Sequence, residues 1–251
     1  MPMNSIAGLR VMLARPASSS SDAIAAGLRN RGAIVSNAPL IRITEPSDQT
    51  ALRAAAENVD AIDWLVFTSA NGVAAFARRR GKPLPARIRI AVVGPATAAA
   101  AQSLLQHPID VIPERHDSDA LAIALIGAAR PSSKMCVFHP EGARSSLASL
   151  LRSAGHLVNA VEAYRTLETP PADIARSVAD ADAIVLMSGS QARALARGLS
   201  ASSAALRGKT IVAIGERTAR DAREAGLPVD ATASGATPEA IASVLGSARG
   251  G

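Results

Sequence analysis

The single tyrosine of the chain, Tyr164, is the first residue whose chemistry stands out. It lies in the segment 161–170 (VEAYRTLETP), which is typical of an extended connector rather than of a core strand or helix. A phenol in such a place can donate a proton or a hydrogen bond to a bound molecule. A tyrosine at a strand edge also commonly packs against its neighbours, and the residues alone leave both roles open.

Small polar residues stand where several predicted strands end and helices begin. A helix start presents unpaired backbone N–H groups and the positive end of the helix dipole, so it can hold a carboxylate or phosphate without a charged side chain. The candidate binding residues are Ser69, Asn71, Thr97, Ser188, Ser190 and Thr218. Each could equally do no more than cap its helix, so binding and capping both stand as interpretations.

The serine turns belong to a repeat that runs through most of the chain. The stretch 66–77 (VFTSANGVAAFA) has the same order of apolar, polar and small residues as 185–196 (VLMSGSQARALA), with a serine at the same place in each. Further matches join 90–98 (IAVVGPATA) to 211–219 (IVAIGERTA), and 11–16 (VMLARP) to 136–140 (CVFHP). We therefore expect two copies of one unit, at roughly 9–125 and 133–246.

Each copy alternates short apolar strands with helices, a pattern typical of a parallel sheet covered on both faces. The sequence therefore predicts an α/β fold with two parallel-sheet lobes. The segments that end at Pro46 and Pro170 contain β-forming residues and no helix is expected directly after them, so we interpret them as extended connectors between the lobes. Ligands of open α/β sheets bind beyond the carboxyl ends of the strands, which is where the polar turns fall.

Composition argues against several classes of function. The net charge of +6 favours an anionic partner, but the lack of a dense basic run and the presence of only three Phe, one Tyr and one Trp argue against nucleic acid. No GxGxxG or Walker loop is present, and the four histidines lack the spacing of metal ligands, so no metal site is expected. Cys136, the only cysteine, is predicted to be a buried structural thiol. No apolar run approaches the roughly 18 residues that span a bilayer, and the start of the chain lacks signal-peptide features, so we expect a cytoplasmic protein without membrane contact.

Taken together and in this order, these features resemble the uroporphyrinogen-III synthase family. The matching stretches are an opening strand that ends in Arg-Pro, then DWLVFTSANGV, AVVGPATA, the AYRT connector, a second strand with its serine turn, and AIGERTA followed by AGLPVDATA. The resemblance covers nearly the whole chain and rests on the order and spacing of the motifs.

The resemblance implies two α/β lobes joined by a two-stranded linker. In that family the chain starts in one lobe, builds the other and then returns. Lobe one would hold 1–38 plus 170–251, lobe two would hold 47–160, and the linker would be 39–46 with 161–169. The two copies of the repeat would then not coincide with the two lobes.

The resemblance also implies an activity, that of a lyase of tetrapyrrole biosynthesis which uses no cofactor. Such an enzyme converts the linear hydroxymethylbilane into uroporphyrinogen III, inverting the last pyrrole ring and releasing water. Tyr164 would be the acid that assists loss of the hydroxyl group. Arg15 and Arg144, together with the six turn residues named above, would bind the carboxylates of the substrate. We further expect a monomer with no partner besides this small molecule.

Two features depart from the family pattern. Met187 and Gly189 stand where the family often has Thr and Pro, which makes Ser188 and Ser190 less typical as ligand contacts. The stretch QHPID lacks the usual glycine before its proline, a change expected to affect only a loop. The alternative function is a non-catalytic two-lobed binding or regulatory module for a polyanionic small molecule, because a fold by itself does not fix a function.

Overall fold

The computed structural model describes residues 6–14, 19–143, 145–170, 172–199 and 203–249. Its contacts divide the chain into two compact units: unit 1 is Met1–Arg42 with Leu167–Gly251, and unit 2 is Ile43–Thr166. The chain therefore passes from one unit to the other twice. None of the helices within the described ranges has the length and apolar character that crossing a membrane requires.

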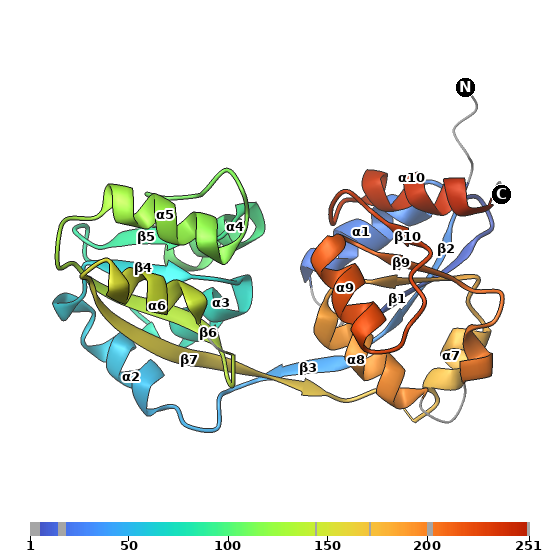
Figure 1. Ribbon diagram of the computed structural model, residues 1–251, viewed down its shortest axis with the longest axis horizontal. Coiled ribbons are helices and arrows are strands. Elements are labelled where there is room, and N and C mark those ends of the chain that lie inside the picture. Colours follow the sequence, from blue (N-terminus) through green and yellow to red (C-terminus); the bar gives the residue numbers. More distant parts are fainter. Residues whose placement is uncertain (1–5, 15–18, 144, 171, 200–202, 250–251) are drawn as a thin grey trace. The chain divides into compact units, whose positions relative to one another are not determined.

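Unit 1 is a five-stranded sheet with helices on both faces (Figure 1). The strand order is β10-β9-β8-β1-β2, and neighbouring strands run parallel. Helices α1 and α10 pack on one face, and α7, α8 and α9 on the other. The strands are β1 (Arg10–Ala14), β2 (Ile34–Ala38), β8 (Ala183–Leu186), β9 (Thr210–Ala213) and β10 (Ala231–Thr232). The helices are α1 (Ser19–Arg29), α7 (Ile174–Ala179), α8 (Gly189–Gly198), the 3-10 helix η2 (Ser203–Leu206), α9 (Glu216–Glu224) and α10 (Pro238–Arg249).

Unit 2 repeats this architecture with the strand order β3-β7-β6-β4-β5. Helices α2, α3 and α4 pack on one face, and α5 and α6 on the other. A single parallel bridge from Val111 to Ala91 takes the place of β10. The strands are β3 (Ile41–Thr44), β4 (Trp64–Phe67), β5 (Arg89–Val92), β6 (Lys134–Pro140) and β7 (Leu157–Glu168). The helices are α2 (Thr50–Glu57), the 3-10 helix η1 (Val59–Ala61), α3 (Ala70–Arg80), α4 (Pro95–Leu105), α5 (Ser118–Ala128) and α6 (Ser146–Ser153).

The predicted α/β class with two parallel-rich sheets is confirmed. One detail of the prediction was wrong, because helices do follow the segments that end at Pro46 and Pro170. These are the short helices α2 and α7, which begin at Thr50 and Ile174. Proline disfavours the α conformation in the residue before it, which agrees with the extended segments up to Pro46 and Pro170.

Equivalent aspartates start equivalent strands in the two sheets. The carboxylate of Asp63 accepts a hydrogen bond from the backbone N–H of Lys134 at 2.8 Å. Asp182 accepts one from Arg10 in the same way at 2.9 Å, and the hydrogen bonds from Arg10 lower the pKa of Asp182 to about 2. One strand further along, the same kind of bond joins Asp110 to Ile90 and Asp230 to Ile211. The two sheets therefore share the contacts that the sequence repeat predicts. Each copy of the repeat contributes strands to both units, so the copies do not coincide with the units.

The five aromatic residues of the chain all lie in unit 2. Phe67 and Phe138 stack with ring centroids 4.7 Å apart, and Phe76 lies 5.1 Å from Phe138. All three rings are fully buried, with Phe76 extending from α3 into the core that contains Phe67 and Phe138. The core of unit 1 contains no aromatic ring, so the three stacked and tilted rings distinguish the core of unit 2 from it.

We predict that Phe138→Ala lowers the free energy of unfolding of unit 2 by about 3–5 kcal/mol, because it leaves a cavity among three rings. Urea unfolding followed by the fluorescence of Trp64, the only tryptophan, reports on unit 2. Ile123→Ala is the matched control, since Ile123 is 70% exposed, and it should change stability by less than about 0.5 kcal/mol. Equal losses in the two variants would contradict this account of the core.

Candidate functional site

Ser69 sits at the turn between β4 and α3 and caps the helix. All four residues of β4 are buried, and the strand ends where the chain becomes polar at Thr68 and Ser69. Ser69 has an extended backbone, and its Oγ accepts a hydrogen bond from the N–H of Gly72 at 3.2 Å. The capping interpretation of Ser69 is therefore correct.

The same hydroxyl also contacts Tyr164. Ser69 Oγ donates to Tyr164 Oη at 3.0 Å, and the tyrosine side chain is almost fully buried in the core beneath α3. Tyr164 belongs to β7, whereas Ser69 follows the end of β4. These two strands are not neighbours, because β6 lies between them. A register shift between His139 and Pro140, near the end of β6, pairs Pro140 with Tyr164. The phenol thus extends past the end of β6 to the first turn of α3.

Tyr164 therefore packs and makes a specific polar contact at once. It lies inside the continuous strand β7 rather than in a separate connector. Burial raises the pKa of Tyr164, while hydrogen bonds with Ser69 and Asn71 act in the opposite direction. The phenol is thus protonated at neutral pH. When Ser69 is the donor to Oη, the tyrosine O–H is available to donate to a third group.

Thr97 and Thr218 occupy the same place in the first turns of α4 and α9. Their side chains are 4% and 8% exposed, so both hydroxyls lie at the buried side of the turn. Each helix begins after a glycine, Gly94 or Gly215, with no side-chain cap. A role in substrate binding for these two threonines stays a prediction.

In the second serine turn, in unit 1, the polar side chains form hydrogen bonds within the turn itself. Ser188 Oγ accepts from the N–H of Gln191 at 3.3 Å, and the Gln191 amide oxygen accepts from the N–H of Met187 at 2.9 Å. Ser190 Oγ accepts from the Arg193 guanidinium at 3.2 Å. Both serines thus have local partners, which agrees with their less typical sequence context.

A carboxylate also stands beside this turn. A Cβ atom added at Gly189 would lie only 2.1 Å from Asp221 Oδ2 of α9, so the aspartate packs directly against the glycine. A fixed negative charge at this helix start disfavours an anionic ligand there. The two serine turns are therefore equivalent in backbone but not in electrostatics. Neither Gln191 nor Asp221 carries a sequence signal that would have singled it out.

The site residues fall into two groups. Ser69, Asn71 and Tyr164 come together in unit 2, where Thr97 belongs to the neighbouring helix α4. Ser188, Ser190 and Thr218 belong to unit 1. Arg15 and Arg144 lie outside the described residues. His116, which the sequence analysis did not select, packs against the start of α4, since a Cβ atom at Gly94 would lie 3.1 Å from its ring.

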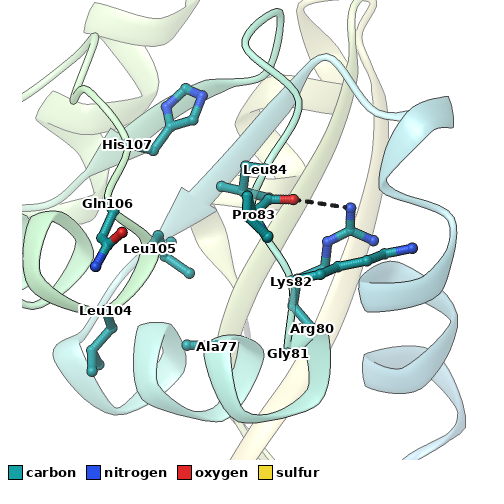
Figure 2. A pocket seen from close by; sticks show the side chains of 10 residues that line it. All are labelled: Ala77, Arg80, Gly81, Lys82, Pro83, Leu84, Leu104, Leu105, Gln106 and His107. Carbon is teal, nitrogen blue, oxygen red and sulfur yellow. Dashed lines mark hydrogen bonds between the residues drawn. The ribbon is translucent and has the colours of Figure 1, made fainter.

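A hollow of about 350 Å³ lies in unit 2 beside the C-terminal ends of α3 and α4, at the other end of these helices from the Ser69 turn (Figure 2). It contains no predicted site residue. At its border Gln106 adopts a left-handed backbone conformation with φ 51°, where the equivalent Gly226 of unit 1 has φ 83°. The departure from the family pattern at QHPID thus replaces a glycine at a helix end with a residue that adopts this conformation less easily.

We predict that the absorbance of the Tyr164 phenolate titrates above pH 10, the ordinary pKa of tyrosine. Because the chain has one tyrosine, the signal is unambiguous. Ser69→Ala should move the midpoint further upward, since it removes the hydrogen bond that favours the phenolate. It should also destabilise the protein by about 1 kcal/mol through the lost cap.

Ser188→Ala is the matched control for this titration. It removes the equivalent cap in unit 1 and should leave the tyrosine midpoint unchanged. Circular dichroism over the same pH range would show that the chain stays folded. An unchanged midpoint in Ser69→Ala, or a shift in Ser188→Ala, would contradict the assigned contact.

Comparison with known proteins agrees with the geometry. A mutant uroporphyrinogen III synthase from the extremely thermophilic bacterium Thermus thermophilus is 19% identical, with a TM-score of 0.59 over 96% of this chain and 98% of that chain. The uroporphyrinogen-III synthetase of Helicobacter pylori is 14% identical, with a TM-score of 0.63 over 96% of this chain and 100% of that one. At these identities the likeness shows a shared fold. The curated proteins gave no match.

The family assignment comes from the sequence itself. The family model for uroporphyrinogen-III synthase HemD matches residues 22–243. This match spans both units and every candidate site residue of the chain except Arg15. The chain belongs to the uroporphyrinogen-III synthase family.

Proposed function

We propose that this protein cyclises hydroxymethylbilane to uroporphyrinogen III and that Tyr164 is the acid in the first step. The observation that carries this assignment is the contact between Ser69 and Tyr164. It holds a neutral phenol at the carboxyl edge of the unit 2 sheet, beside the start of α3. This edge is where ligands of open α/β sheets bind.

The hydrogen bonds around Ser69 favour proton donation by the phenol. The N–H of Gly72 donates to Ser69 Oγ, and Ser69 Oγ donates to Tyr164 Oη. Such a chain polarises each of its members, and it stabilises negative charge on the tyrosine oxygen. The positive end of the α3 dipole acts in the same direction.

The proton balance of the reaction closes on Tyr164. The phenol gives its proton to the hydroxyl oxygen of the substrate, the C–O bond breaks and water leaves. The electrophilic azafulvene that results is attacked by the substituted carbon of ring D, giving a spiro intermediate. The spiro intermediate then opens by breaking the bond between that carbon and the methylene bridge to ring C, which leaves an electrophilic azafulvene on ring C. The other α carbon of the inverted ring D attacks this methylene and closes the macrocycle. The proton that this carbon loses restores the phenol.

Positioning contributes more than acid strength in this scheme. The azafulvene is already reactive, so the protein mainly has to hold ring D where its substituted carbon can attack. The start of α3 offers backbone N–H groups and the exposed amide of Asn71 to a substrate carboxylate. We assign further carboxylate contacts to Thr97 in unit 2 and to Arg15, Arg144, Ser188, Ser190 and Thr218.

The unit 2 contacts have the strongest support among these. Ser69 and Asn71 are both joined to Tyr164, whereas the carboxylate of Asp221 stands beside the turn that holds Ser188 and Ser190. We also propose that the enzyme acts as a cytoplasmic monomer, with lobe boundaries near residues 38, 47, 160 and 170. Membership of the synthase family favours the enzyme over a non-catalytic binding module.

Incubation of the purified protein with hydroxymethylbilane tests the function. After oxidation of the products and separation of the isomers, we expect type III to predominate, because closure on the enzyme inverts ring D. Spontaneous closure gives type I. A product that is type I alone, at the rate of a reaction without protein, would overturn the assignment.

A further inference from the structure

A second hollow runs along α6 beside β6 and β7 in unit 2, and His139, near the carboxyl end of β6, forms part of its wall. Its volume is about 530 Å³, and its polar lining consists of His139, Ser145, Ser146, Ser149 and Arg152. Alanines form the rest of the wall, and none of the described residues that line it is acidic. The hollow therefore combines two basic side chains with three hydroxyl groups.

His139 is the most buried of the polar groups in this lining. Its side chain is 8% exposed, and its Nδ1 lies 2.9 Å from the carbonyl oxygen of Pro140. A carbonyl only accepts, so Nδ1 carries the hydrogen of the neutral ring. Nε2 accepts in that form, and it becomes a donor when the ring takes up a second proton together with a bound carboxylate. Within the described ranges Nε2 has no protein partner. A protonated imidazole would thus offer a charged N–H donor from within the wall.

The start of α6 adds to the positive character of the hollow. Ser145 caps this helix by accepting from the N–H of Ala148 at 3.1 Å, which leaves the first N–H groups unpaired by the cap. Arg152 donates to the carbonyl oxygen of Val158 at 3.0 Å, which holds its guanidinium in place. Glu162, the register partner of His139 on β7, accepts from the N–H of Gly142 at 2.9 Å and is not part of the lining.

The internal repeat points to the same residue. Matching CVFHP with VMLARP aligns His139 with Arg15, each directly before a proline. The strands concerned hold equivalent positions, because β6 lies between β4 and β7 as β1 lies between β8 and β2. In the sequence, both copies thus have a basic residue directly before the proline, and in unit 2 that residue, His139, lines a hollow.

We propose that this hollow is a subsite for a carboxylate side chain of the tetrapyrrole, with Nε2 of His139 as its buried donor. The proposal rests on the proposed function. An acetate or propionate arm suits the site, because the carboxylate would meet the imidazole, the serine hydroxyls and the start of α6. His139 is a binding residue in this scheme and takes no part in the proton transfer assigned to Tyr164.

Steady-state kinetics of the full chain with hydroxymethylbilane test the subsite. We expect His139→Ala to raise KM about ten-fold, as for the loss of one hydrogen bond to a charged group, with kcat unchanged. His139→Gln keeps a neutral N–H donor and should raise KM less. His107→Ala is the matched control, since His107 lines the hollow beside the C-terminal ends of α3 and α4, and it should leave both constants unchanged.

Thermal unfolding would show which variants are folded. If His139→Ala does not fold, the kinetics of His139→Gln test the subsite in its place. A folded variant with unchanged KM, or one in which only kcat falls, would overturn the subsite. Failure of the proposed function is a different result, in which the wild-type protein forms no type III isomer. If the wild-type protein forms no type III isomer, the subsite can still be tested by measuring the affinity for uroporphyrin III. Equal affinities of the wild type and His139→Ala would then overturn the subsite.

Discussion

The hydrogen bond from Ser69 to Tyr164 joins the three elements on which the proposed chemistry depends. It ties the start of α3 to β7 across the end of β6, and it holds the phenol oxygen beside this turn. Burial keeps the phenol neutral, while the donors at Ser69 and Asn71 limit how far its pKa rises. The same small turn therefore caps a helix and holds the phenol, and in the proposed mechanism it also presents N–H groups to a substrate carboxylate.

The two units share their backbone architecture but differ in the side chains around their serine turns. Both units keep the strand order, the aspartates that start equivalent strands and the serine caps. They differ in what surrounds the serine turns: Tyr164 and three phenylalanines in unit 2, Asp221 and an aliphatic core in unit 1. The backbone of the turn was thus copied, whereas the polar environment that suits an anionic substrate is stronger in unit 2.

The sequence predicted the features that depend on neighbouring residues. Alternating apolar runs and polar turns identified the α/β class and the repeat, because these follow from local periodicity. They left capping as one of two interpretations of Ser69. The reach of Tyr164 could not be predicted, since it depends on a register shift near the end of β6 that has no local signal. The packing of Asp221 on Gly189 and the burial of Thr97 arise from contacts between helices, which spacing along one chain does not reveal.

Tyr164→Phe tests the central claim most directly, because it removes the donated proton and keeps the packed ring. Turnover of hydroxymethylbilane to type III product should be measured together with the affinity for uroporphyrinogen III. The account predicts that kcat falls at least about ten-fold while product affinity stays within about two-fold. An unchanged kcat in a folded variant would contradict it and would leave Tyr164 with a packing role alone.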